Sequence, residues 1–153
     1  MAELAFQDYY PDNLSYCYGC GRLNEQSLQI KSRWEGEESV ARICLTHSYP
    51  MQQALGAPPW DGTPEELSFV QQYLDGIEFD DYDHLIQLCD CLCLPDGPVL
   101  MDKRLLDVSL RYGVDEYTVP RWKAFFAVRL ALEADLGCAV YDLLPGVVEN
   151  TLM

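Results

Sequence analysis

A pair of cysteines near the start of the chain has a spacing that is typical of chemical sites. Cys17 and Cys20 are separated by two residues, as in half of a structural zinc site or in a redox-active thiol pair. A structural zinc ion needs four ligands, and the other Cys and His residues offer no second pair with the usual spacing before a turn. A thioredoxin-like pair would begin a helix after a strand, whereas an irregular stretch precedes Cys17. Cys17 and Cys20 are therefore metal-binding candidates that lack the rest of a site.

A second group of cysteines has the form Cys-Asp-Cys-Leu-Cys. On a helix, Cys89 and Cys93 would share one face because they are four residues apart, while Cys91 would point elsewhere. Three such side chains do not converge on one metal ion. A buried cysteine behaves as a small hydrophobic residue, so this pattern favours packing over metal binding.

Histidines are scarce, because the chain has only His47 and His84. His47 follows an apolar stretch, and His84 lies in the acidic first turn of a predicted helix. The sequence contains no nucleophile elbow, phosphate-binding loop, H-E-x-x-H motif or dinucleotide fingerprint. General acid–base chemistry and metal chemistry therefore have few residues to use.

These residues would be positioned by a short β-hairpin and the helices that follow it. Residues 28–34 alternate apolar and polar side chains, and residues 39–45 are β-branched enough to pair with them across residues 35–38. A hairpin alone is only marginally stable, so it must pack on the rest of the chain. Residues 46–64 are predicted to be a loop, because their prolines and glycines exclude a helix or a central strand.

Helical periodicity begins after this loop. Asp80 or Asp81 can cap the second predicted helix, Gly113 follows the third, and Thr118 can cap the fourth. The fourth helix also places Arg129 and Glu133 at a spacing that allows an ion pair. The helices are predicted over residues 65–74, 80–94, 102–112, 118–136 and 141–144.

The fourth predicted helix carries a broad apolar face, which we interpret as core and not as a cofactor site. This face consists of Trp122, Phe125, Phe126, Leu130 and Leu136.

The charge of the chain is strongly negative and unevenly distributed. The formal net charge is -15, and no Lys or Arg lies between Arg42 and Lys103. Such a field repels phosphate backbones and attracts basic surfaces, so direct nucleic-acid binding is not expected, whereas docking on a basic protein is. A plain solvated face that aids solubility is the alternative interpretation. The acids of this region are Asp61, Glu65, Glu66, Asp75, Glu78, Asp80, Asp81, Asp83, Asp90, Asp96 and Asp102.

Length and composition favour one compact domain. At 153 residues, of which 49% are hydrophobic, the chain can bury a sizeable core. The first ten residues include Glu3 and Asp8 where a secretory signal would need positive charge, and no apolar run reaches membrane-spanning length. The seven cysteines form an odd set, so reduced thiols are expected. These features predict a soluble, cytoplasmic protein without a membrane partner.

Residues 5–24 and 28–42, which include Cys17-Tyr-Gly-Cys20, resemble the N-terminus of PaaI-like hotdog thioesterases. This resemblance covers about a quarter of the chain, and in that family the lead-in precedes the first two strands. It implies that the Cys17 and Cys20 pair belongs to a lead-in that binds no metal. The central helix on which thioester hydrolysis depends has no counterpart after Arg42.

From about residue 41 the resemblance changes. Residues 41–52, 80–90, 103–113 and 143–147 resemble the C-terminal half of bacterial HD-domain phosphohydrolase-like proteins. The family uses a His, an adjacent His-Asp pair and a distant Asp to hold a divalent metal whose bound water attacks phosphate. On this resemblance Asp90 matches the distant Asp, and His47 matches an accessory histidine.

The missing HD ligands predict a loss of catalysis. The His-Asp pair should lie upstream of residue 41, where thioesterase-like sequence stands, and two ligands cannot make a closed metal site. Gene fusion, an assembly error, laboratory recombination or a sequence generator would each produce such a join.

The sequence therefore predicts a mainly helical α+β protein in one compact unit. It would consist of a hotdog-like segment over residues 1–45 with the hairpin, the loop over 46–64, and four to five helices of a truncated HD-like bundle over 65–153. The expected function is a non-catalytic acidic protein that docks on a basic partner, as an inhibitor or nucleic-acid mimic, without a cofactor. A residual metal-dependent HD phosphohydrolase, which would need a divalent metal, and an acyl-CoA thioesterase are the alternatives. Self-association is expected if the truncated bundle leaves apolar surface uncovered.

Overall fold

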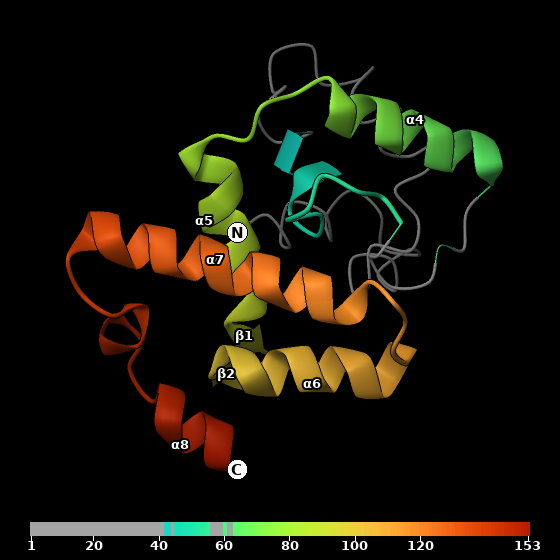
Figure 1. Cartoon of the computed structure of the whole chain (residues 1–153). Coiled ribbons are helices and arrows are strands. Elements are labelled where there is room, and N and C mark those ends of the chain that lie inside the picture. The colour runs from blue at the N-terminus through green and yellow to red at the C-terminus, as the bar shows by residue number, and fades with distance from the viewer. Residues whose placement is uncertain (1–41, 44, 56–59, 61–62) are drawn as a thin grey trace, which may run out of the picture.

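The described part of the chain is mainly helical, with a small antiparallel sheet between α5 and α6 in the order of elements (Figure 1). The computed structural model describes residues 42, 43, 45–55, 60 and 63–153. Its elements are α4 (Pro64–Asp75), α5 (Asp81–Cys91), β1 (Cys93–Leu94), β2 (Gly97–Pro98), α6 (Met101–Tyr112), α7 (Thr118–Leu136), the 3-10 helix η2 (Val140–Leu143) and α8 (Val147–Leu152).

Local sequence explains where α4 and α5 begin. The Thr63 side chain accepts a hydrogen bond from the Glu66 amide while the Glu66 carboxylate accepts one from the Thr63 amide, which is a capping box. Asp80 and Asp83 form the same reciprocal pair at the start of α5. Asp80 is thus the cap of this helix, as predicted.

The second predicted helix ends earlier than expected, at Cys91 instead of residue 94. Beyond it, Cys93 pairs with Pro98 and Leu94 pairs with Gly97 in a two-stranded hairpin. The Asn150 side chain of α8 donates a hydrogen bond to the Pro98 carbonyl at 3.0 Å. Gly97 has a φ of 133°, a backbone conformation that favours glycine, and a Cβ atom there would also lie 2.7 Å from the Asn150 Nδ2 atom. The helix α8, whose Asn150 supports the hairpin, was not predicted from the sequence.

Thr118 does not cap the fourth helix but is its first residue, which corrects the prediction for this position. Tyr117 precedes the helix as its N-cap residue and makes no side-chain cap hydrogen bond. The Thr118 hydroxyl instead accepts a hydrogen bond from the Asp115 amide and donates one to the Asp115 carboxylate, each at 2.9 Å. These bonds fix the turn before α7.

The predicted N-terminal hairpin falls mostly outside the described residues. The expected strand 28–34 and residues 39–41 lie outside them, as do Cys17 and Cys20. Arg42, Ile43 and Leu45, which the second strand was expected to contain, are helical, so the strand prediction is wrong for them. Arg42 and Thr46 both donate to the Asp83 carboxylate. A helix places residues four positions apart one turn from each other, whereas a strand would separate them by about 13 Å.

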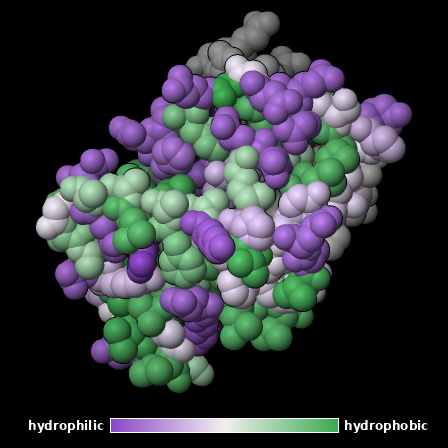
Figure 2. Space-filling view, in the orientation of Figure 1, coloured by the Kyte–Doolittle hydropathy of each residue, from purple (hydrophilic) through white to green (hydrophobic). Residues whose placement is uncertain are grey.

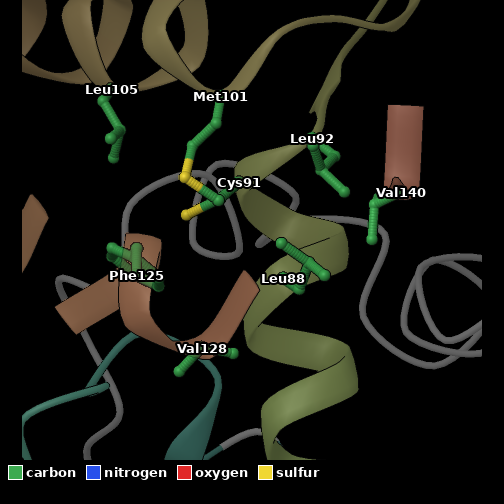
Figure 3. Packing of buried hydrophobic residues seen from close by; sticks show 8 residues of the cluster. All are labelled: Leu88, Cys91, Leu92, Met101, Leu105, Phe125, Val128 and Val140. Carbon is green, nitrogen blue, oxygen red and sulfur yellow. The ribbon is translucent and has the colours of Figure 1, made fainter. Parts of the chain in front are cut away.

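Two hydrophobic clusters form the described core. The first lies between α5, α6, α7 and η2 (Figure 3), and its fully packed members are Leu88, Cys91, Leu92, Met101, Leu105, Phe125, Val128 and Val140. The second joins α4 to the segment before it and contains Leu45, Tyr49, Ala54, Val70 and Leu74.

The buried side of α7 is narrower than the sequence predicted. Phe125 is buried, and Trp122 and Phe126 are half-buried against the first cluster. Leu130 and Leu136 are 58% and 55% exposed, so assigning them to the core was wrong. The helix buries the side that faces α5, and these two leucines lie away from that side.

Exposed apolar residues gather on α6 and α8. Leu110 is 78% exposed and Leu152 is 81% exposed, and Leu106 and Val148 add to the same two helices. Figure 2 shows hydrophobic residues over the lower part of the molecule, where these helices lie, and more hydrophilic residues over the upper part. The surface is therefore divided into regions of different polarity.

Candidate functional site

The most densely bonded polar group in the described residues is the Asp83 carboxylate, whose side chain is 1% exposed. Arg42 approaches it with its Nε atom 3.2 and 3.0 Å from the two carboxylate oxygens. The Thr46 hydroxyl donates to it at 2.7 Å, and the Asp80 amide donates at 3.0 Å. Asp83 thus joins the helical residues Arg42 and Thr46 to the start of α5.

Three further contacts extend this cluster. Gln87, one turn after Asp83, donates from Nε2 to the Thr46 carbonyl at 3.0 Å and is fully buried. The His84 Nδ1 atom lies 3.3 Å from the Gln87 Oε1 atom. The His84 ring also meets Phe79 edge to face, with centroids 5.7 Å apart. We call Arg42, Thr46, Asp83, His84 and Gln87 the polar network.

The electrostatics of the polar network are those of a structural ion pair. Burial alone would raise the pKa of Asp83, but hydrogen bonds from Arg42, the Asp80 amide and Thr46 outweigh burial and hold this pKa below its ordinary value. The hydrogen bond to Asp83 likewise raises the pKa of Arg42. A carboxylate held ionised in this way is a poor proton donor or acceptor near neutral pH. The network therefore fixes two segments of the chain together.

Asp90 and His47, the two residues matched to HD-family ligands, lie in different surroundings. Asp90 is in the last turn of α5, with its side chain 43% exposed and its Oδ1 atom 3.4 Å from Nη2 of Arg104. The Arg104 Nε atom also donates to the Asp90 carbonyl at 3.1 Å. His47 is half-buried, with Nδ1 3.1 Å from the Ile43 carbonyl oxygen.

These contacts give both candidates partners other than a metal. Over residues 42, 43, 45–55, 60 and 63–153, no three His, Cys, Asp or Glu side chains are grouped so that they could hold a metal ion. The assignment of Asp90 and His47 as ligands stays a prediction from the family resemblance.

The cysteines of the 89–93 stretch have two different environments. Cys91 is buried, and its side chain lies beside Met101 in the first cluster (Figure 3), as the packing interpretation predicted. Cys89 and Cys93 are exposed, so that interpretation is wrong for these two. Cys93 is not on the helix, because α5 ends at Cys91.

Burial and nearby negative charge make these thiols weak nucleophiles. Burial, and then the charge of Asp90, raises the pKa of Cys91 well above its ordinary value. Partial burial and the Asp90 carboxylate also raise the pKa of Cys93. Partial burial and the neighbouring Cys93 raise the pKa of Cys89. The stretch is therefore not arranged as a reactive thiolate site.

The thiols are expected to react with a maleimide or iodoacetamide in a fixed order. In the folded protein Cys89 and Cys93 should be modified slowly, at a rate that keeps rising at alkaline pH because their pKa values are raised. Cys91 should be modified only after unfolding, because its side chain is inside the core. Peptide mass spectrometry after timed alkylation measures this order, and modification of Cys91 at the rate of Cys93 would contradict the packing described.

Basic side chains in the described part of the chain are largely occupied by contacts of their own. Lys103 donates to the carbonyl oxygens of Asn150 and Thr151 at 3.0 and 2.8 Å. Arg111 binds the Asp107 carboxylate at 2.7 Å. Arg42 and Arg104 are held in ion pairs with Asp83 and Asp90. The Arg129 Nε atom lies 4.0 Å from the Glu133 carboxylate, the pair predicted from spacing, but makes no hydrogen bond there.

The acids of α4 and of the start of α5 are in a different position. We call Glu65, Asp75, Glu78, Asp80 and Asp81 the acidic face; all five are exposed. Among their carboxylates, only that of Asp80 forms an ion pair with a described basic side chain, at 3.8 Å from Arg42. Arg42 is already bound to Asp83 and also donates to the Glu78 carbonyl oxygen. The acidic face thus keeps most of its charge available for a partner.

Sequence reasoning found the acidic face but missed the polar network. Asp83 had one local signal, its place three residues after the capping Asp80. Gln87 follows four residues later, which places it on the same side of α5. The partner Arg42 is 41 positions away, so its contact with Asp83 left no local signal.

Among the described residues, no helix has both the length and the apolar character needed to cross a membrane. No protein-family model matches the chain, and neither a curated protein nor a solved structure shows significant similarity to it. The resemblances to hotdog and HD-domain proteins stay predictions from sequence.

Proposed function

We propose that the chain is a non-catalytic interaction protein that docks on a basic protein surface through its acidic face. The observation that carries this proposal is the imbalance of charge contacts. Five exposed acids lie between the start of α4 and the start of α5, in the stretch from residue 43 to 102 that has no Lys or Arg. The neighbouring Arg42 and Arg104 are bound to Asp83 and Asp90. In this proposal an HD-like helical remnant serves as the scaffold.

Binding of this kind would act by competition. A surface of fixed carboxylates can occupy the site where a basic protein binds nucleic-acid phosphates, because both present closely spaced negative charge. The proposal therefore includes inhibition of a nucleic-acid-binding partner. A cytoplasmic location is part of the proposal, since free thiols such as the exposed Cys89, Cys93 and Cys138 suit a reducing compartment.

The acidic face is expected to bind a fluorescent nona-arginine peptide with steep salt dependence. Replacing Glu65 with Gln, Glu78 with Gln and Asp81 with Asn should weaken binding about tenfold at low ionic strength, because several partly screened charge contacts of a few tenths of a kcal/mol each are lost. Fluorescence anisotropy from about 0.05 M to about 0.3 M NaCl measures both effects, because the Debye length shortens over this range.

A matched control removes equal charge elsewhere. Asp135→Asn, Asp142→Asn and Glu149→Gln neutralise three exposed acids at the other end of the molecule. If both triple variants lose affinity equally, net charge and not the acidic face determines binding.

Metal-dependent hydrolysis of a nucleotide or phosphomonoester that disappears in Asp90→Ala would contradict the non-catalytic assignment. Sedimentation of the same samples shows whether self-association through α6 and α8 competes.

A further inference from the structure

Two buried polar side chains that have no hydrogen-bond partner among the described residues lie where α6 ends and α7 begins. Arg121, in the first turn of α7, is 8% exposed, and its Nη1 atom has no hydrogen-bond partner. Ser109, in the last turn of α6, is also 8% exposed, and its Oγ atom has no partner either. Buried polar atoms are nearly always hydrogen-bonded, so an orphaned pair calls for a physical explanation.

The pairing of the two helices places these side chains at the same level. α6 and α7 run in opposite directions, joined by a short turn after Tyr112 (Figure 1). Leu105 of α6 points toward Phe125 of α7 in the first cluster (Figure 3). Ser109 is one turn after Leu105, and Arg121 is one turn before Phe125, so both belong to the next layer along the α6–α7 interface.

The buried charge of Arg121 makes this layer of side chains energetically unfavourable. Burial lowers the pKa of Arg121, because the charged guanidinium loses hydration, although nearby Asp115 partly opposes this shift. The Asp115 carboxylate is bound to the Tyr117 amide and the Thr118 hydroxyl, and it forms no salt bridge with Arg121. Asp83, by contrast, is a buried charge with Arg42 against it. A buried cation without a paired anion is strongly unfavourable.

We propose that Arg121 and Ser109 bind the carboxylate group of a small organic acid. The guanidinium supplies an N–H donor with a full positive charge, and the serine supplies an O–H donor, so the two can serve the two oxygens of one carboxylate. A water molecule could accept these bonds but would leave the charge unbalanced. A doubly charged phosphate would exceed the single positive charge, next to the negative Asp115.

The surroundings limit the acid to a small body. Leu105, Phe125 and Cys91 pack in the adjacent layer, so an acid of this kind would present methyl or methylene groups to apolar side chains. This site lies apart from the acidic face and does not depend on the proposed docking function.

Sodium acetate is the probe that tests this site, with sodium chloride at equal ionic strength as reference. Acetate at a few times its dissociation constant should raise the Tm of the wild-type protein by about 2–4 °C more than chloride, because a ligand that binds only the folded state stabilises it. Line broadening of ¹³C-acetate in NMR should accompany the shift. An equal effect of acetate and chloride would overturn the proposal.

Substitutions of Arg121 and Ser109 test whether acetate binds at this site. Arg121→Met keeps the length of the side chain and removes its charge, so it should weaken acetate binding at least about tenfold. In chloride it should be as stable as the wild-type protein or more so, because an unpaired buried charge is removed. Ser109→Ala should weaken acetate binding less. Lys123→Met, an exposed position on the same helix, should leave acetate binding unchanged.

Either of two results would contradict the site. Acetate-dependent broadening that persists in Arg121→Met would place the anion elsewhere. Marked destabilisation of Arg121→Met in chloride would mean that the guanidinium already has a stabilising partner. If Arg121→Met does not fold, Ser109→Ala decides the question through the same NMR measurement, since unchanged acetate binding in that variant removes the hydroxyl from the site.

Discussion

Replacing Asp83 with alanine is expected to destabilise the protein by about 3 kcal/mol, because a buried ion pair loses its anion. The substitution leaves Arg42, whose side chain is only 26% exposed, without its carboxylate partner. It also removes the carboxylate that accepts hydrogen bonds from the Thr46 hydroxyl and from the amide of Asp80, the N-cap residue of α5. Urea unfolding followed by circular dichroism measures the loss.

A matched control is available two positions earlier. Asp81→Ala removes an exposed acid from the first turn of the same helix and should cost less than about 1 kcal/mol, the usual size of a helix-dipole contribution. A double-mutant cycle with Arg42→Ala isolates the pair itself. Equal losses for Asp83→Ala and Asp81→Ala would show that the polar network contributes little to stability.

The same residue makes stability depend on pH in a defined direction. The pKa of Asp83 is lowered in the folded protein, so folding is favoured above the ordinary carboxyl pKa of 3.8. That stabilisation is lost as the pH falls through the folded-state pKa. The stability advantage of the wild-type protein over Asp83→Asn should therefore be full near neutral pH and should shrink in acid.

Phe125→Ala is the second substitution with a large expected effect, a loss of about 3–5 kcal/mol. Phe125 is 5% exposed and packs between α5 and α6 in the first cluster (Figure 3). Removing the ring takes away its contacts and leaves a cavity, because close-packed surroundings relax only in part. Thermal and urea unfolding measure the change.

Phe126 is the natural control for this substitution. It is half-buried, and the Arg129 guanidinium lies 5.5 Å from its ring centroid. Phe126→Ala should cost clearly less than Phe125→Ala, because part of the ring is already hydrated. The lost cation–π contact adds back only about 0.5–2 kcal/mol. The reverse order would mean that α7 is rotated relative to the packing described.

Local signals predicted the helices well where those signals were complete. Asp80 has both an acceptor side chain and Asp83 three positions later, and α5 begins there. The range predicted for the longest helix agrees with α7, where Gly137 adopts a left-handed conformation and ends the helix. In each case the deciding residues lie within one turn of the boundary.

Long-range contacts decided what local patterns could not. The end of α5 depends on a hairpin that Asn150 supports from 52 positions away. The helical conformation at Arg42 and Leu45 is stabilised by Asp83 and by the second cluster, whereas β-branched composition favoured a strand. The exposed state of Cys93 follows from the early end of α5.

The candidate functional residues also include some that local sequence predicts and some that depend on long-range contacts. The negative charge of the acidic face could be predicted from composition, but its exposure could not, because Asp83 belongs to the same run of acids and is buried. The orphaned Arg121 and Ser109 could not, because their importance depends on how α6 and α7 align. Nothing in the local sequence marks either residue as lacking a partner.

The position of α5 has a consequence for how the protein opens. Its first half holds Asp83 and Gln87 against residues 42–46, and its second half contributes Leu88 and Cys91 to the packing with α6 and α7. In native-state hydrogen exchange, the amides of α5 would therefore exchange only when both neighbouring regions have opened. The region of α4 could open sub-globally while the α6–α7 region stays folded, so the two would behave as separate foldons that share one helix.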